Sequence, residues 1–173
     1  MVAILAKMKT DRLSIVIQRM SEDDIPRLAA VLGWPLHGLR HRWQAQLAGE
    51  REMLVAFVDD VPVGAVSIEY QSDVPGFLHL FALDVAEAHR RRGIGTHLVE
   101  RVEQEALTRG DSGVYLEVAL TNVDARRLYE RLSYVVSGEP FEKGWNPPRE
   151  DGTPGEWESD IVQRMFKHFP KAR

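Results

Sequence analysis

Short runs of this chain are either alternately apolar and polar or continuously apolar, and both patterns are typical of β-strands. The predicted strands are Ser14 to Arg19, Met53 to Val58, Val63 to Tyr70, Leu78 to Val85, Val114 to Leu120, a short strand beginning at Tyr134 to Val136, and Trp157 to Phe169. Asp59 to Pro62, between the second and third runs, predicts the turn of a hairpin.

Other segments carry apolar residues at helical spacing between residues that start and stop helices. The first helix follows Ser21 to Asp24, whose acidic residues suit a helix N-terminus, and it ends before Gly33 and Pro35. Three further helices are predicted at His37 to Leu47, at Thr96 to Arg109 with Gly110 as terminator, and at Asn122 to Leu132. The segment Glu142 to Glu156 is rich in glycine and proline and predicts a long loop.

The resulting order is a strand, two helices, three strands, a helix, a strand, a helix and further strands. Such a mixture indicates a domain of the α/β (α+β) class. A chain of 173 residues matches the size of one domain, here residues 1–173, and such a domain buries about 70% of its unfolded surface.

Composition and charge exclude several classes of site and of binding partner. The chain has no cysteine, which excludes disulfides, thiolate zinc sites and a cysteine acyl-enzyme, and which suits a reducing cytoplasm. With 22 basic and 26 acidic residues the net charge is −4, which argues against nonspecific binding of nucleic acid or of a membrane surface. The apolar run Val2 to Ala6 is too short for a secretory signal, so we expect a cytoplasmic protein.

The most informative segment lies between the apolar run Leu78 to Val85 and the helix that starts near Thr96. It reads Arg90, Arg91, Arg92, Gly93, Ile94 and Gly95. Glycines let successive backbone amides point at one anion, the helix adds the positive end of its dipole, and the arginines add charge, so the segment predicts a phosphate site. It has neither the Lys of a Walker loop nor the third glycine of a dinucleotide loop.

A second motif follows the strand Val114 to Leu120. Asn122, Ala125 and Tyr129 match the pattern N-x-x-A-x-x-x-Y, while Ser133 and Tyr134 stand where that pattern continues with Gly-Phe. The first segment in turn matches Q/R-x-x-G-x-G/A through Arg90, Gly93 and Gly95. In this order and spacing the two motifs resemble those of the GNAT superfamily of acetyl-CoA-dependent N-acetyltransferases, over roughly Ser14 to Phe141.

This resemblance implies the acyl-CoA N-acyltransferase fold, a mixed, mostly antiparallel central sheet of six to seven strands flanked by about four helices. It also implies that acetyl-CoA is the cosubstrate. The residues that it places beside the coenzyme are Leu83, Asp84, Val85, Arg90, Arg91, Arg92, Gly93, Ile94, Gly95, Thr96, Asn122, Ala125 and Tyr129. A backbone N–H near Leu83 to Val85 would meet the thioester oxygen. For Asn122 a helix N-cap is an equally good explanation.

Acetyl transfer to an amine needs a base, because an amine with a pKa of about 10 arrives mostly as ammonium. Glu117 is the candidate, since it lies on the strand face opposite Leu116 and Val118 and precedes Tyr129 by 129 − 117 = 12 residues, as in the similar ribosomal-protein alanine acetyltransferases. Glu69 is the second choice, and a solvated or ion-paired glutamate is the alternative for either. The resemblance places the Tyr129 phenol near the coenzyme sulfur, where it can donate a proton to the thiolate.

The amine acceptor is left open, as a small molecule or as a protein amine. Trp34, His37, Glu69 and Trp145 are candidates for the acceptor site, although core packing explains any single tryptophan equally well. His37 and His41 share a helix face without a third ligand, which is a weak metal signal, so no metal is expected. The remaining alternatives are a catalytically silent coenzyme A-binding regulatory module and, for assembly, a homodimer.

Overall fold

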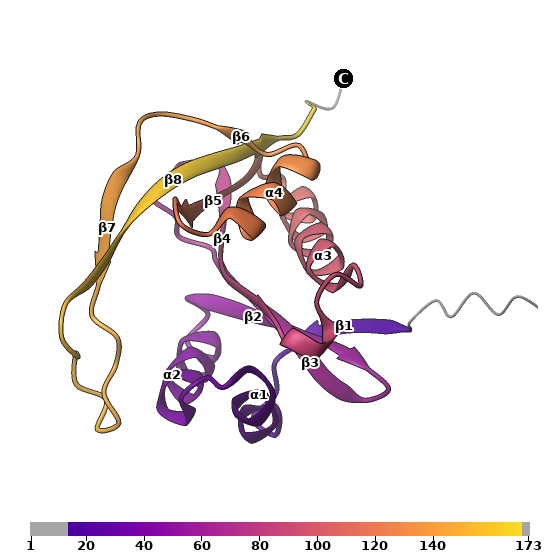
Figure 1. Cartoon of the computed structure of the whole chain (residues 1–173), viewed down its shortest axis with the longest axis vertical. Coiled ribbons are helices and arrows are strands. Elements are labelled where there is room, and N and C mark those ends of the chain that lie inside the picture. The colour runs from indigo at the N-terminus through magenta and orange to yellow at the C-terminus, as the bar shows by residue number, and fades with distance from the viewer. Residues whose placement is uncertain (1–13, 171–173) are drawn as a thin grey trace, which may run out of the picture.

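The computed structural model describes residues 14–170, which form one mixed α/β unit (Figure 1). The predicted N-terminal run Val2 to Ala6 lies outside the described residues. The strands are β1 (Ile15–Arg19), β2 (Arg51–Val58), β3 (Val61–Glu69), β4 (Phe77–Val85), β5 (Gly113–Ala119), β6 (Val135–Val136), β7 (Phe141–Trp145) and β8 (Glu158–His168). The helices are α1 (Asp24–Leu32), α2 (Leu36–Leu47), α3 (Ile94–Arg109) and α4 (Val123–Arg131), with a 3₁₀ turn η1 (Glu87–His89).

The strands form one sheet in the order β1-β2-β3-β4-β5-β8-β6, and β7 also pairs with β8. Every pairing is antiparallel except that of β4 with β5. The predicted mixed, mostly antiparallel sheet with four helices is therefore confirmed, and within residues 14–170 the sheet has 8 strands rather than six to seven.

Two predicted connections differ from the structure. The hairpin turn is only Asp59 and Asp60, both with positive φ, so Val61 and Pro62 belong to β3. The loop predicted at Glu142 to Glu156 is wrong in its first part, because Phe141–Trp145 is the strand β7 and only residues 146–157 connect it to β8. Long-range pairing with β8 outweighs the local effect of Gly144 in this segment.

The helices cover the two faces of the sheet unequally. On one face α3 and α4 enclose the larger core, in which Leu54, Ile68, Leu80 and Leu116 are buried beneath α3 residues such as Leu98. On the other face α1 and α2 cover only the part formed by β2 and β3, where Met53, Val55 and Ala65 are buried. The figure shows α1 and α2 below this part, while β7 and β8 extend beside the rest (Figure 1).

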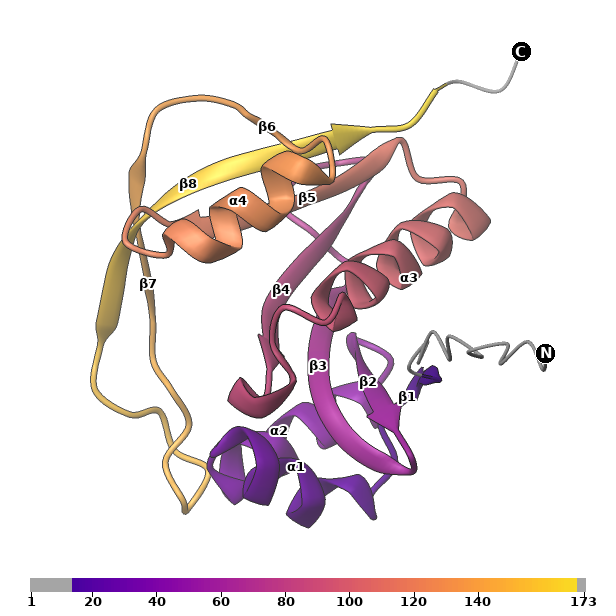
Figure 2. The ribbon, with the colours of Figure 1, turned by 45° about the vertical axis from the view of Figure 1, so that its right-hand side comes forward.

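The sheet opens between β4 and β5. Their parallel pairing is limited to Phe77 with Gly113, Leu78 with Val114 and His79 with Tyr115. Beyond these pairs β4 stays with β3 and β5 stays with β8, so the two strands separate toward their C-terminal ends (Figure 2). Neither separating edge has a strand partner in the described part of the chain, so each offers backbone polar groups to a bound molecule.

Candidate acetyl-CoA and acceptor site

The segment between η1 and α3 forms a tight turn at the helix N-terminus. Arg91 has φ 59° and Gly93 has φ 82°, two left-handed residues that turn the chain into α3. The backbone amides of residues 91–96 donate to no acceptor among the described residues. Arg91 and Arg92 are exposed beside them. Free amides at a helix N-terminus with flanking arginines are well suited to hold a phosphate group.

Close packing of α4 joins the second motif to this turn. A Cβ placed on Gly95 would lie 3.3 Å from Cδ2 of Leu128, so glycine lets α3 and α4 approach closely here. The Asn122 side chain accepts a hydrogen bond from the Ala125 amide at 3.1 Å, which confirms its predicted N-cap of α4. Ser133 adopts φ 69° at the end of α4, where a glycine would be unstrained. The two sequence motifs are thus neighbours in space.

The C-terminal end of β4 is irregular and tied to the turn. The β3 residues Ala65 and Ser67 pair with Asp84 and Phe81, so β4 carries one extra residue there, and Ala82 has φ 50°. Arg90 binds the end of the strand, since its Nε donates to the Val85 carbonyl at 2.8 Å. The two oxygens of Asp84 accept from the Val85 amide at 2.8 Å and from Trp34 Nε1 at 3.1 Å.

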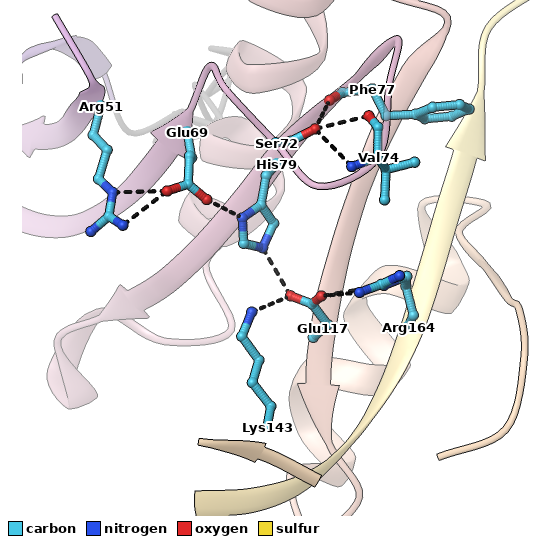
Figure 3. A network of polar contacts seen from close by, with 9 residues as sticks. All are labelled: Arg51, Glu69, Ser72, Val74, Phe77, His79, Glu117, Lys143 and Arg164. Carbon is cyan, nitrogen blue, oxygen red and sulfur yellow. Dashed lines mark hydrogen bonds and ion pairs between the residues drawn. The ribbon is translucent and has the colours of Figure 1, made fainter. Parts of the chain in front are cut away.

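A polar network crosses the sheet face that α1 and α2 leave uncovered (Figure 3). Pairing across the sheet puts Glu69, His79 and Glu117 on one face. The buried imidazole of His79 lies between the two carboxylates, with Nδ1 3.0 Å from Glu69 Oε2 and Nε2 2.9 Å from Glu117 Oε2. Arg51 donates to Glu69 at 2.9 Å. Lys143 donates to Glu117 at 2.6 Å and Arg164 donates to it at 2.9 Å.

The network fixes the charge of its two glutamates. Burial raises the pKa of Glu117, but the hydrogen bonds from His79 and Lys143 outweigh it and hold this pKa at about 2. Burial likewise raises the pKa of Glu69, and here the hydrogen bond from His79 and the charge of Arg51 leave it below its ordinary value.

Comparison with known proteins agrees with this geometry. The model of the acetyltransferase (GNAT) family matches residues 18–134, a span that includes the turn, Asn122, Tyr129 and most of the network. This chain belongs to the GNAT acetyltransferase family. The match confirms the resemblance that the two motifs predicted.

Individual relatives of this GNAT chain are distant. "Probable N-acetyltransferase 14" of Xenopus tropicalis is 29% identical over 128 residues, which is 70% of this chain and 59% of that protein. Human N-acetyltransferase 8 is 31% identical over 99 residues, which is 57% of this chain and 41% of that protein. The matched part of the chain thus spans about 40% to 60% of the length of these two curated relatives.

Solved structures of similar fold cover nearly the whole chain. The ribosomal-protein-S18-alanine N-acetyltransferase of Escherichia coli has a TM-score of 0.63 at 18% identity, covering 90% of this chain and 96% of that one. Arabidopsis thaliana NAA60 in complex with acetyl-CoA has a TM-score of 0.66 at 18% identity, covering 90% and 98%. At these identities the likeness shows the GNAT fold.

Tyr129 of this GNAT chain lies in the larger core. Its side chain is 6% exposed and its ring packs edge-on against Tyr134, with the centroids 5.7 Å apart. Burial raises the pKa of Tyr129, so its hydroxyl keeps its proton at every physiological pH. A phenol in this state can donate a hydrogen bond or a proton but cannot serve as a base.

The residues predicted for the acceptor site are only partly brought together. Glu69 belongs to the network, and Trp34 packs against the smaller core while it binds Asp84. His37 is partly buried on α2, and Trp145 is exposed on β7. Across residues 14–170, no group of three or more His, Cys, Asp or Glu side chains is arranged to hold a metal ion, and no helix is long and apolar enough to cross a bilayer.

Sequence reasoning missed several members of the network, namely His79, Lys143, Arg164 and Arg51. His79 is the one polar residue in the apolar run 78–83, and this interruption of the pattern was a signal that could have identified it. Lys143 fell within the predicted loop. Arg164 and Arg51 are brought to the glutamates only by strand pairing, with Arg164 opposite Glu117 and Arg51 opposite Glu69. Local sequence carries no sign of such long-range partners.

Proposed function

We propose that this chain transfers the acetyl group of acetyl-CoA to a primary amine by direct attack within a ternary complex. The observation that carries the proposal is the run of free amides at residues 91–96, placed where β4 and β5 separate. The membership of the chain in the GNAT acetyltransferase family supports it.

The donor would lie in the opening between β4 and β5. The amides of residues 91–96 bind the diphosphate together with the helix dipole of α3, and Arg91 and Arg92 add positive charge. The extended pantetheine arm then follows the unpaired edge of β4. Because Asp84 already occupies the Val85 amide, the bulged residue Leu83 is the better candidate to donate a backbone N–H to the thioester oxygen.

The acceptor ammonium would approach the network from the open sheet face. We propose that Glu117 accepts its proton, directly or through water, while Glu69 and His79 hold Glu117 in place. A carboxylate with a pKa near 2 is a weak base while Lys143 and Arg164 both bind it. The acceptor ammonium, a group of the same chemistry, would displace the Lys143 ammonium. This displacement places the acceptor on Glu117 and frees one lone pair of the Glu117 carboxylate.

The neutral amine nitrogen then forms a bond to the thioester carbon, and the carbonyl oxygen takes the negative charge of a tetrahedral intermediate. When this intermediate collapses, the carbon–sulfur bond breaks, the attacking nitrogen releases its second proton to solvent, and the neutral amide remains. Tyr129 donates its hydroxyl proton to the leaving thiolate and later regains a proton from solvent. Free coenzyme A and an N-acetylated amine are the products.

Calorimetric titration with acetyl-CoA, followed by a thiol-release assay over a panel of primary amines, tests the proposal. We expect binding by the wild-type chain and thiol release with at least one class of amine. Gly95→Val, which pushes a side chain toward Leu128 at the turn, should weaken acetyl-CoA binding at least ~10-fold. Tight binding without release for every amine would instead indicate a regulatory module, and absence of binding would contradict the proposal.

A further inference from the structure

Arg42 extends from α2 toward the sheet face that carries the network. Its Nη1 donates to the Ser67 hydroxyl at 3.2 Å, and its guanidinium lies 5.1 Å from the Trp34 ring centroid and 5.8 Å from that of Phe81. The Phe81 ring in turn stacks on His79 with the centroids 5.3 Å apart. One aromatic ring therefore separates Arg42 from the centre of the network.

Arg42 makes no ion pair with a carboxylate of residues 14–170. Other cations bind the two glutamates of the network. Asp84 accepts a hydrogen bond from Trp34, on whose ring Arg42 lies, and it is also bound by Arg90. Burial and the charge of Arg51 both lower the pKa of Arg42. A guanidinium nevertheless stays charged in proteins, so Arg42 keeps its positive charge and has N–H donors beyond the one that binds Ser67.

The charged side chains on this sheet face also favour a ligand that carries a negative group. Of four cationic side chains at this face, Arg51 binds Glu69, and Lys143 and Arg164 bind Glu117, whereas Arg42 binds the Ser67 hydroxyl. The charge of Arg42, which no carboxylate between residues 14 and 170 pairs, is unfavourable for a simple alkylammonium ion bound nearby, since like charges at close range in a partly desolvated site repel. An acceptor that brings its own negative charge removes this repulsion.

We propose that the acceptor is a small amine that also carries a carboxylate, and that Arg42 binds this carboxylate while the amine lies at Glu117. The inference rests on the proposed N-acetyltransferase function and names its substrate class. Arginine suits the role because its planar guanidinium binds a carboxylate through two parallel hydrogen bonds. Trp34 and Phe81, on which the guanidinium lies, keep it extended over the site.

The experiment compares amines that differ only in the negative group. The pairs are 4-aminobutanoate with 1-aminobutane, 6-aminohexanoate with 1-aminohexane, and phenylalanine with phenylalaninamide, each assayed by thiol release at saturating acetyl-CoA. We expect kcat/KM to be at least ~10-fold higher for the carboxylate member of one or more pairs. Aminoethyl phosphate and a tripeptide with an acidic side chain test a phosphate and a peptide as the source of charge. Preference for either over every carboxylate amine would overturn the proposal.

Variants of α2 assign the effect to Arg42. Arg42→Met should raise KM for the preferred carboxylate amine ~10-fold with little change in kcat, since binding that is equal in ground and transition states affects KM alone. It should leave kcat/KM for the partner amine that lacks a carboxylate within about twofold, and Arg42→Lys should restore part of the loss. The matched control is Arg40→Met, because Arg40 is exposed two residues away and lines a hollow with Glu22 and Gln44.

Two results separate failure of this inference from failure of the proposed function. Thiol release with the amines that lack a carboxylate as fast as with carboxylate amines, or equal loss for both in Arg42→Met, would overturn the assignment of Arg42 and leave the N-acetyltransferase intact. No thiol release with any amine, despite acetyl-CoA binding, would contradict the enzyme itself and the inference with it.

Discussion

Nε2 of His79 lies 2.9 Å from Oε2 of Glu117, and this contact joins β4 to β5 at the last pair before the strands separate. His79 pairs with Tyr115, and Glu117 lies two residues further along β5 on the same face. The network therefore stands at the point where the sheet opens.

Removal of His79 should destabilise the protein strongly. In His79→Ala the carboxylates of Glu69 and Glu117 lose the hydrogen-bonding imidazole that joins them, and the 5% exposed side chain leaves a cavity. We expect the free energy of unfolding, measured with urea at neutral pH, to fall by about 3 kcal/mol. His41→Ala, at an exposed position of α2, is the control and should change it by less than about 0.5 kcal/mol. Equal losses would contradict a stabilising role for the network.

Glu117 should make stability depend on acid pH. Its pKa is about 2 in the folded protein, below the ordinary glutamate value of 4.5, so its contribution is present above about pH 4.5 and is lost as the pH falls toward 2. The difference in unfolding free energy between the wild type and Glu117→Gln should shrink by about 3 kcal/mol over that range. Urea titrations at each pH measure it. The same comparison with Glu150→Gln, at an exposed loop residue, should show little change.

Lys143 should hold down the pKa of Glu117. Its ammonium donates to Glu117 at 2.6 Å, so Lys143→Met should raise that pKa by about one unit. The titration of the Glu117 side-chain carbon, followed by NMR and assigned through Glu117→Gln, measures the change. Lys167→Met is the matched control, because Lys167 pairs with Glu103 at 2.7 Å instead. An unshifted titration in Lys143→Met would show that the Lys143 contact is not maintained in solution.

Tyr129→Phe tests the proposed acid. The substitution keeps the ring in the core and removes only the hydroxyl, so the fold should be retained and acetyl-CoA binding nearly unchanged. Turnover should fall by about 10²-fold or more, because the thiolate then leaves without a proton donor. Thiol release with saturating acetyl-CoA and the best amine of the panel measures it. Unchanged kcat would remove the acid assignment.

Much of the fold was predictable because local pattern and long-range packing agree over most of the chain. The helix α3 has apolar residues at helical spacing and ends at Gly110 in a left-handed conformation, as its sequence predicts. Asn122 caps α4 for the same local reason. The strand β7 was not predicted, since Gly144 weakens the local preference of this segment for a β-strand. A Cβ at Gly144 would overlap the Trp157 ring, so the glycine is required by packing across the β7–β8 hairpin.

The candidate site was predictable only as far as its motifs are local. The turn at Arg90 to Gly95 and the residues Asn122 and Tyr129 each follow from a short pattern. The environment of Glu117 does not, because its partners His79, Lys143 and Arg164 come from three other strands. Their charges lower the pKa of Glu117 and so set how strong a base it is.

A crystal structure of the chain with bound coenzyme A tests the central claim most directly. We predict diphosphate oxygens within hydrogen-bonding distance, about 3 Å, of backbone amides between residues 91 and 96, with the sulfur beside the Tyr129 hydroxyl. A diphosphate bound elsewhere, with those amides facing only solvent, would contradict the account.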